Sequence, residues 1–139
     1  MKFTENAKIL LVEDNLVNQR VAVLIMKRLN LRCDIASDGQ KAIEMYKERL
    51  YDLIFMDIEM PLMDGLQSSK LIREFEKNEG LKNRASIIAL TASEPDDLAG
   101  KYLEAGMDGF IEKPIRADLL ADFLENFRKD TRAKKEIAG

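Results

Sequence analysis

The stretch that decides the fold of this chain is residues 53–65, LIFMDIEMPLMDG. Its first four residues form an unbroken apolar run that stops at Asp57, and the remainder holds the proline and glycine of a turn. A short apolar run bounded by turn residues predicts a buried β-strand. Asp57 would then lie at the carboxyl end of that strand, where open α/β sheets place their functional groups.

A second acidic pair follows another apolar run. Residues 9–12, ILLV, are followed at once by Glu13 and Asp14. Two strands that each stop at acidic residues suggest one shared acidic pocket, provided that the strands are neighbours in a parallel sheet.

Apolar runs alternate with amphipathic stretches five times, a pattern that indicates βαβ units and an α/β fold with a doubly wound parallel sheet. We expect strands over Ile9–Val12, Arg32–Ala36, Leu53–Met56, Ser86–Leu90 and Gly109–Ile111, and helices over Leu16–Leu29, Gly39–Arg49, Leu66–Lys77, Asp96–Ala105 and Ala117–Phe127. The common strand order for a sheet of this size is 2-1-3-4-5. That order brings Thr91 and Lys113 to the same rim as the acidic residues.

The periodicity of the helical stretches predicts which faces are buried. In the first helix we expect the core to receive one face, made of Val21, Leu24, Ile25 and Leu29. The last helix carries a wider stripe that we expect to be mostly core, with room for a partner at its edge: Leu119, Leu120, Phe123, Leu124 and Phe127.

Composition narrows the functional classes. The chain has 139 residues, enough for one domain, and a net charge of −3, which favours neither nucleic acid nor an anionic membrane. It has no apolar stretch near the ~18 residues of a membrane span and no signal-peptide core at its start. The single cysteine, Cys33, is expected to be a small buried hydrophobe and fits a reducing cytoplasm.

The chain contains no histidine. This excludes histidine-ligated zinc sites, Ser–His and Cys–His nucleophile pairs, and a phosphohistidine supplied by the chain itself. Carboxylates, hydroxyls and lysines must therefore carry any chemistry.

Three carboxylates at one rim repel one another when they are about 3–4 Å apart, so one must take up a proton or a cation must bind. Mg²⁺, a hard cation with oxygen ligands, is the first choice. Lys113 and Thr91 add an ammonium and a hydroxyl that could hold a transferring phosphoryl group. A carboxylate such as Asp57 can attack phosphorus and form an acyl phosphate.

Over about Ala7–Phe127 the chain resembles the receiver domain of two-component response regulators. The motifs that carry the resemblance are LVEDN at 11–15, MDIEMPLMDG at 56–65, LTA at 90–92 and GFIEKP at 109–114. Asn18 and the wording of the second motif are most similar to receivers of hybrid sensor histidine kinases. The resemblance implies a flavodoxin-like (βα)5 fold.

The resemblance also implies a role for individual residues. Asp57 would be the phosphoacceptor, and Lys113, Thr91 and the backbone of Ala92 would bind the phosphoryl group. Mg²⁺, or Mn²⁺ as a substitute, would be held by Glu13, Asp14, Asp57 and the backbone carbonyl of Glu59. Thr91 and Phe110 would form the switch, the bond before Pro114 would be cis, and Glu59 and Ser93 would tune dephosphorylation.

The function implied is that of a phosphoacceptor switch that catalyses only its own phosphorylation and dephosphorylation. A histidine kinase or a histidine phosphotransfer protein would supply the phosphoryl group. A protein reader would bind the face made by the fourth helix, fifth strand and fifth helix. We expect an extension at 1–6, the receiver at 7–127 and a polar tail or linker stub at 128–139, either as a stand-alone protein or as part of a hybrid kinase.

Two other functions remain open. One is a Mg²⁺-dependent phosphohydrolase with an aspartyl nucleophile. Such enzymes usually have a second aspartate two residues after the nucleophile, where this chain has the longer Glu59. The chain also has little room for the cap region that such enzymes use to bind substrate. The other is an interaction module of the same fold that is never phosphorylated. For single residues the ordinary structural interpretations are an N-cap at Asp14 or Asn15, a helix cap at Asp64, and core packing for Met56, Met60 and Met63.

Overall fold

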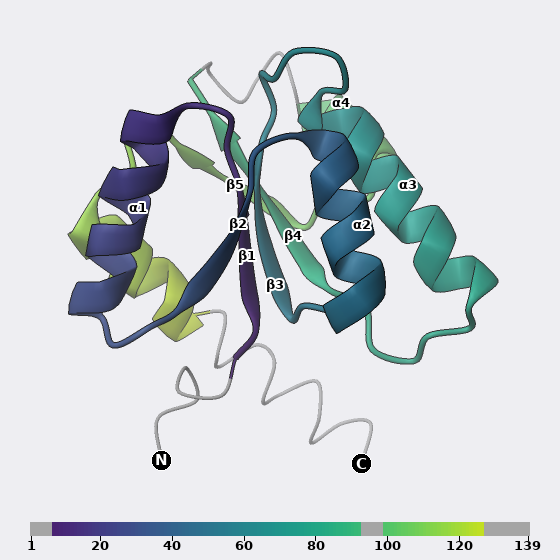
Figure 1. The fold of residues 1–139 in the computed structure, drawn as a ribbon, viewed down its shortest axis with the longest axis horizontal. Helices are drawn as coiled ribbons and strands as arrows, with labels where there is room; N and C mark the ends of the chain where they lie inside the picture. The colour runs from purple at the N-terminus through teal and green to yellow at the C-terminus, as the bar shows by residue number, and fades with distance from the viewer. Residues whose placement is uncertain (1–6, 93–98, 127–139) are drawn as a thin grey trace.

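The computed structural model describes residues 7–92 and 99–126, and within them one five-stranded parallel sheet is flanked by helices (Figure 1). The strand order is β2-β1-β3-β4-β5, so the predicted order is confirmed. In chain order the elements are β1 (Ile9–Val12), α1 (Leu16–Arg28), β2 (Cys33–Ala36), α2 (Gly39–Arg49), β3 (Leu53–Asp57), α3 (Gly65–Asn78), β4 (Ser86–Thr91), α4 (Ala99–Glu104) and β5 (Gly109–Glu112). Residues 117–126 form a further helix, named here the C-terminal helix.

The boundaries differ from the expected ones mainly at the strand ends. β3, β4 and β5 each run one residue further than the apolar pattern predicts, because Asp57, Thr91 and Glu112 still take part in the ladder. Hydrophobicity cannot reveal a polar residue that completes a strand. The expected start of the fourth helix at Asp96 and the expected end of the last helix at Phe127 lie outside the described residues.

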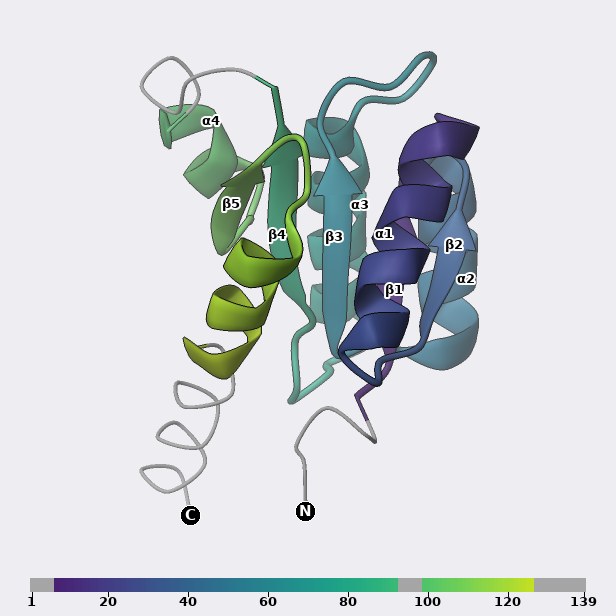
Figure 2. The ribbon, with the colours of Figure 1, turned by 90° about the vertical axis from the view of Figure 1, so that its left-hand side faces the viewer.

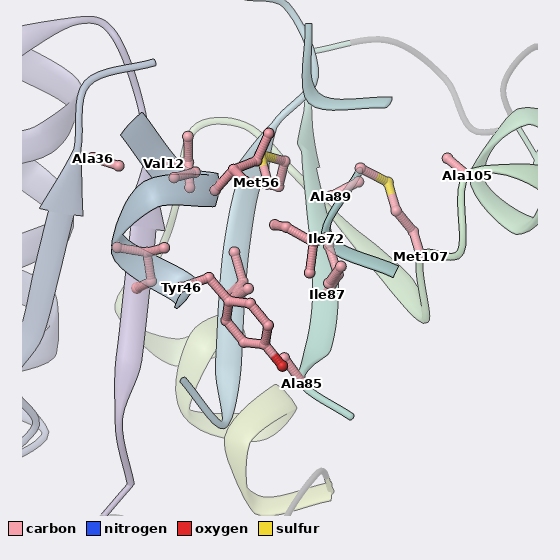
Figure 3. Close-up of a cluster of buried hydrophobic side chains, with 14 of the residues drawn as sticks. Val12, Ala36, Tyr46, Met56, Ile72, Ala85, Ile87, Ala89, Ala105 and Met107 are labelled. Atoms are coloured by element: carbon pink, nitrogen blue, oxygen red, sulfur yellow. The ribbon is translucent and has the colours of Figure 1, made fainter. Parts of the chain in front are cut away.

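The helices cover the sheet in two layers. α1 and the C-terminal helix lie on one face, and α2, α3 and α4 lie on the other (Figures 1 and 2). Alternate strand residues supply the two cores, since successive side chains of a strand point to opposite faces. Figure 3 shows the core under α2, α3 and α4, a single buried cluster that includes Val12, Met56, Ile72 and Ala89. No helix in the described part of the chain is long and apolar enough to cross a membrane.

The second core lies under α1 and the C-terminal helix. Its members include Leu11, Phe55 and Leu90 from the central strands, and Cys33 packs at its edge as a partly buried residue. Burial, and secondarily the neighbouring Asp34, raise the pKa of the Cys33 thiol to about 11, so the thiol stays protonated and behaves as the expected hydrophobe.

The predicted buried face of α1 is wrong in part. Val21 is 43% exposed and Leu24 61% exposed, whereas Ala22 and Met26 are buried against the sheet. Most residues of α1 are apolar, so two faces of the helix satisfy the same periodicity. The small Ala22 side chain lets the helix approach the sheet closely, and this favours the face that sequence periodicity did not select.

The amino ends of β4 and β5 are tied to the helices by a buried polar network. Glu76 accepts hydrogen bonds from the Tyr46 hydroxyl at 2.6 Å and the Ala85 N–H at 2.8 Å. Arg73 donates to Glu76 at 2.7 Å, to the Ala85 and Gly106 carbonyls, and to Asp108 at 2.8 Å. Because each buried charge meets several partners, the network holds α2, α3 and the α4–β5 turn to the sheet.

The N-caps follow the sequence. Asn15 caps α1, Asp38 caps α2, and Asp64 forms a capping box with Gln67 at the start of α3. Asp64 is therefore a helix cap, as expected. Gly106 ends the turn after α4 with a φ of +84°, in the left-handed region that glycine adopts without strain.

Gly65 lies where β3 and α3 approach most closely. A Cβ atom on this residue would come within 2.3 Å of the Asp57 carbonyl oxygen and 2.9 Å of the Ile58 Cα. Both neighbours are backbone atoms of the loop that carries Asp57. Only glycine therefore lets α3 begin directly beneath that loop.

We predict that Gly65→Ala lowers the free energy of unfolding by about 1–3 kcal/mol, because the loop backbone must move to admit the methyl group. Gly100→Ala is the matched control, since a Cβ there meets nothing within 4 Å. In a helix that change should stabilise by up to about 1 kcal/mol. Urea denaturation followed by circular dichroism measures both, and equal effects of the two variants would contradict the close-packing explanation.

Candidate functional site

The acidic residues meet at the carboxyl ends of β1 and β3. Val12 pairs with Met56 in the ladder, so Glu13 and Asp57 leave adjacent strands at the same level. One carboxylate oxygen from each of Glu13, Asp14 and Asp57 lies within 4.8 Å of the others. Glu13 and Asp57 are both 2% exposed, whereas Asp14 is exposed at the edge. The structure thus brings together the three acids that the sheet order predicts to be neighbours.

The backbone holds Glu13 in place from two sides. Its N–H donates to the Ala36 carbonyl at 3.1 Å, and its carbonyl accepts from the Gln19 side-chain amide at 2.7 Å. The side chain of Asn18, one residue before Gln19 in the first turn of α1, lowers the pKa of the Glu13 carboxylate. The first turn of α1 therefore acts on both the backbone and the side chain of this residue.

Asp57 is fixed by the loop that follows it. Its Oδ1 accepts a hydrogen bond from the Glu59 N–H at 3.1 Å. The Ile58 N–H donates to the Leu90 carbonyl at 3.1 Å, and the Ile58 carbonyl accepts from the Gly65 N–H at 3.0 Å. These bonds fold the loop back over α3 and keep the carboxylate at the rim.

Lys113 brings the one ammonium group among the described residues that contacts these acids. Its Nζ lies 3.0 Å from Asp57 Oδ1 and 3.2 Å from Glu13 Oε1. The Lys113 N–H donates to the Thr91 carbonyl at 2.8 Å, which ties the end of β5 to the end of β4. The Lys113–Pro114 peptide bond is cis, as the resemblance implies.

The three ionisable groups in contact at the rim have shifted pKa values, and the two carboxylates are shifted in opposite directions. Burial, a hydrogen bond with Glu13 and its charge raise the pKa of Asp57 to about 7, although Lys113 opposes this. Burial acts to raise the pKa of Glu13 as well, but hydrogen bonds with Asp57, Asn18 and Lys113 outweigh it and lower the pKa. Burial acts to lower the pKa of Lys113, and the two carboxylates reverse that effect and raise it. One proton shared between two buried carboxylates produces this pattern.

The donor set suits a hard divalent cation. All three groups are carboxylates, and one side of the cluster is open because Asp14 is exposed. Mg²⁺ binds such oxygen ligands and keeps several of its waters, for which an open side is needed. Lys113 brings one positive charge to three carboxylates, so the cluster has room for the charge of a divalent cation.

The remaining residues singled out from the sequence lie around this rim. Thr91 is buried at the end of β4, and the next residue, Ala92, is exposed. Glu59 is exposed on the β3–α3 loop. Phe110 lies on β5 and is 42% exposed. Ser93 lies outside the described residues. Met56 and Met60 are buried and Met63 packs against them, as expected for core residues.

Sequence reasoning missed two contributors. Gln19, whose side chain holds the Glu13 carbonyl, had no motif to mark it, because a glutamine in a first helical turn is usually solvated. Tyr102 of α4 stacks on Phe110, with ring centroids 5.7 Å apart and ring planes at 14°. An aromatic residue eight positions before another gives no signal across a helix–strand connection.

The fold and the acidic rim define a class, the doubly wound α/β proteins with carboxylates at the switch point of the sheet. The profile of the family described as "Response regulator receiver domain" matches residues 9–125, which is most of the chain. The chain therefore belongs to this family, the receiver modules of two-component signalling.

A relative shows the same affiliation. The chain is similar to Hybrid signal transduction histidine kinase F of Dictyostelium discoideum, with 41% identity over 120 residues that cover 86% of this chain and 11% of that kinase. The chain thus spans about a ninth of the length of this relative. The similarity to receivers of hybrid histidine kinases inferred from Asn18 and its neighbouring motifs is confirmed.

Solved structures agree. The receiver domain of Ssk1 from Saccharomyces cerevisiae, crystallised with the histidine phosphotransfer protein Ypd1, superposes with a TM-score of 0.78 at 32% identity and covers 86% of this chain and 87% of its own. The receiver domain of sensor histidine kinase PA1611 from Pseudomonas aeruginosa has magnesium in its active-site cleft. It gives a TM-score of 0.74 at 34% identity over 86% of this chain and 95% of its own.

We predict a pH dependence that originates at Asp57 in metal-free protein. The folded state raises its pKa from 3.8 to about 7, so the folded protein retains a proton that the unfolded chain releases. Stability from this group is complete below about pH 4 and is lost as pH rises toward 7. The unfolding free energy of the wild type relative to Asp57→Asn should therefore fall across that interval.

Denaturation in EDTA between pH 4 and 7 measures this difference. Asp118→Asn, at an exposed residue of the C-terminal helix, is the control for the loss of one carboxylate at the surface. A difference for Asp57→Asn that does not change with pH would contradict the raised pKa.

Proposed function

We propose that this receiver domain accepts a phosphoryl group on Asp57 from the phosphohistidine of another protein. The observation that carries the proposal is the position of the Asp57 carboxylate, buried at a strand end, with Lys113 Nζ at 3.0 Å and two further carboxylates around it. In the transfer, an Asp57 oxygen attacks phosphorus and the phosphorus–nitrogen bond to the donor's histidine breaks. The histidine nitrogen leaves with the electron pair, and an acyl phosphate remains.

Each residue at the rim has a part in that step. Lys113 balances the charge of the incoming phosphoryl oxygens, and its own position is fixed by the hydrogen bond to the Thr91 carbonyl. Thr91 and the backbone of Ala92, at the end of β4, would contact the phosphoryl group. Glu13, Asp14, Asp57 and the Glu59 carbonyl would hold Mg²⁺, which when bound neutralises the acids and lets an anion approach.

The donor is proposed to be a histidine kinase or a histidine phosphotransfer protein, in keeping with the complex of Ypd1 with the Ssk1 receiver. The reader is proposed to bind the face of α4, β5 and the C-terminal helix. Phe110 and the exposed Leu103 and Leu119 lie on these elements. Phosphorylation would draw Thr91 toward Asp57 and shift Phe110 between two packings.

We predict that acetyl phosphate with Mg²⁺ labels the wild type with about one phosphoryl group per chain and does not label Asp57→Asn. The amide of asparagine cannot act as the nucleophile, while its size keeps the rim intact. Phos-tag electrophoresis or intact mass spectrometry measures the label. Asp118→Asn is the control and should be labelled like the wild type.

Three results would count against this assignment. Stoichiometric labelling of Asp57→Asn would place the acceptor elsewhere. A wild type that takes no label would support the alternative of an interaction module with an idle pocket, and steady turnover of a generic phosphate ester would support the phosphohydrolase.

We predict that Glu59→Ala changes the lifetime of the phosphoryl group severalfold without preventing phosphorylation. Its side chain is exposed two residues after Asp57, where we expect it to flank the path of an attacking water, whereas its carbonyl survives the substitution. Loss of label over time after removal of acetyl phosphate gives the lifetime. Glu44→Ala, on the exposed face of α2, is the control. Equal lifetimes in wild type and Glu59→Ala would remove Glu59 from the dephosphorylation step.

A further inference from the structure

Phe110 lies on the ring of Tyr102. The two rings are nearly parallel, at 14°, with centroids 5.7 Å apart. Phe110 is 42% exposed, but Tyr102 is only 5% exposed. Tyr102 of α4 is therefore the buried ring against which the inner face of the Phe110 ring packs.

This ring pair is linked to the rim through the sheet. Phe110 pairs with Ala89 in the β4–β5 ladder, and Ala89 belongs to the same buried cluster as Tyr102. Paired residues in a parallel ladder point to the same face, and so does every second residue along a strand. Thr91, two residues after Ala89, consequently lies on the face of β4 that Phe110 and α4 cover.

The hydroxyl of Tyr102 is buried and has no hydrogen-bond partner among the residues that the structure describes. The other two tyrosines differ in this respect. The Tyr46 hydroxyl donates to Glu76 at 2.6 Å, and the Tyr51 hydroxyl donates to Asp34 at 2.6 Å. A buried hydroxyl without a partner destabilises the packing that contains it, because it has lost water and gained nothing in exchange.

We propose that Tyr102 is a positioning residue that sets how readily Phe110 leaves its outward packing. The inference deepens the proposed function, since it concerns the regulation of the same switch. The Tyr102 ring stabilises the outward packing by stacking. Its hydroxyl destabilises that packing relative to any arrangement of α4 and β5 in which the hydroxyl regains a partner or water. The two effects oppose each other on one side chain and keep the resting state close enough in free energy to be shifted.

Tyr102→Phe separates the two effects, because it retains the stacked ring and removes only the hydroxyl. The resting packing is then stabilised, so the fraction of chains ready for the phosphoryl-bound packing falls. An analogue of the phosphoryl group binds the more weakly the smaller that fraction is. The variant should therefore be more stable than the wild type and should bind an analogue of the phosphoryl group more weakly.

The probe is beryllofluoride, a phosphoryl mimic, added with Mg²⁺ and followed by isothermal titration calorimetry, with urea denaturation alongside. For Tyr102→Phe we expect a higher denaturation midpoint and a dissociation constant raised about five- to tenfold. Ser69→Ala removes the other buried hydroxyl without a partner among the described residues, from α3. It should raise the midpoint and leave the dissociation constant within about twofold of the wild type.

Tyr46→Phe is the second control, because it removes a hydroxyl that has a partner. It should lower the midpoint and leave the dissociation constant unchanged. An unchanged or lowered dissociation constant for Tyr102→Phe would overturn the inference, as would an equal rise in Ser69→Ala, which would make the effect one of general stability. A wild type that does not bind beryllofluoride would instead overturn the proposed function, and the inference with it.

Discussion

Two buried carboxylates are held against each other at the ends of adjacent parallel strands, and much of the structure follows from that constraint. Glu13 and Asp57 cannot separate, because the β1–β3 ladder sets their spacing and each is bonded to the backbone around it. Their mutual repulsion leaves only a few remedies, which are a proton, the Lys113 ammonium or a metal ion. A site whose carboxylates repel one another when it is empty favours the binding of a cation.

The rest of the fold must offset the loss of stability that the repelling carboxylates cause. The opposite ends of the strands are secured by the Arg73–Glu76 network, in which Arg73 pairs with both Glu76 and Asp108 and Glu76 also accepts the Ala85 N–H. Two apolar cores on either side of the sheet provide the bulk of the stability. The sheet is therefore firmly bonded at one end and carries repelling charges at the other. Proteins commonly combine a well-packed scaffold with a destabilising functional site in this way.

The sequence predicted the sheet and most of the rim. Apolar runs that stop at acid located Asp57, Glu13 and Asp14, and the usual strand order brought them together without further information. Periodicity failed on α1, because residues 21–26 in its middle are all apolar and offer two apolar faces, and packing against the sheet decides between them. The Gln19 contact and the Tyr102–Phe110 stack depend on how helices sit over the sheet, which no local pattern in the sequence encodes.

The bonds of Arg73 to the Gly106 carbonyl and to Asp108 have a mechanical consequence. They attach the end of α4 and the start of β5 to α3, far from Asp57. The other end of β5 carries Lys113 and is bonded to the end of β4. β5 is also paired with β4 along its whole length, so both of its ends are held and a rearrangement at the rim cannot move the strand out of the sheet. A change at the rim would therefore reach the surface of α4 and β5 through the packing of side chains such as Phe110, and not through movement of the strand.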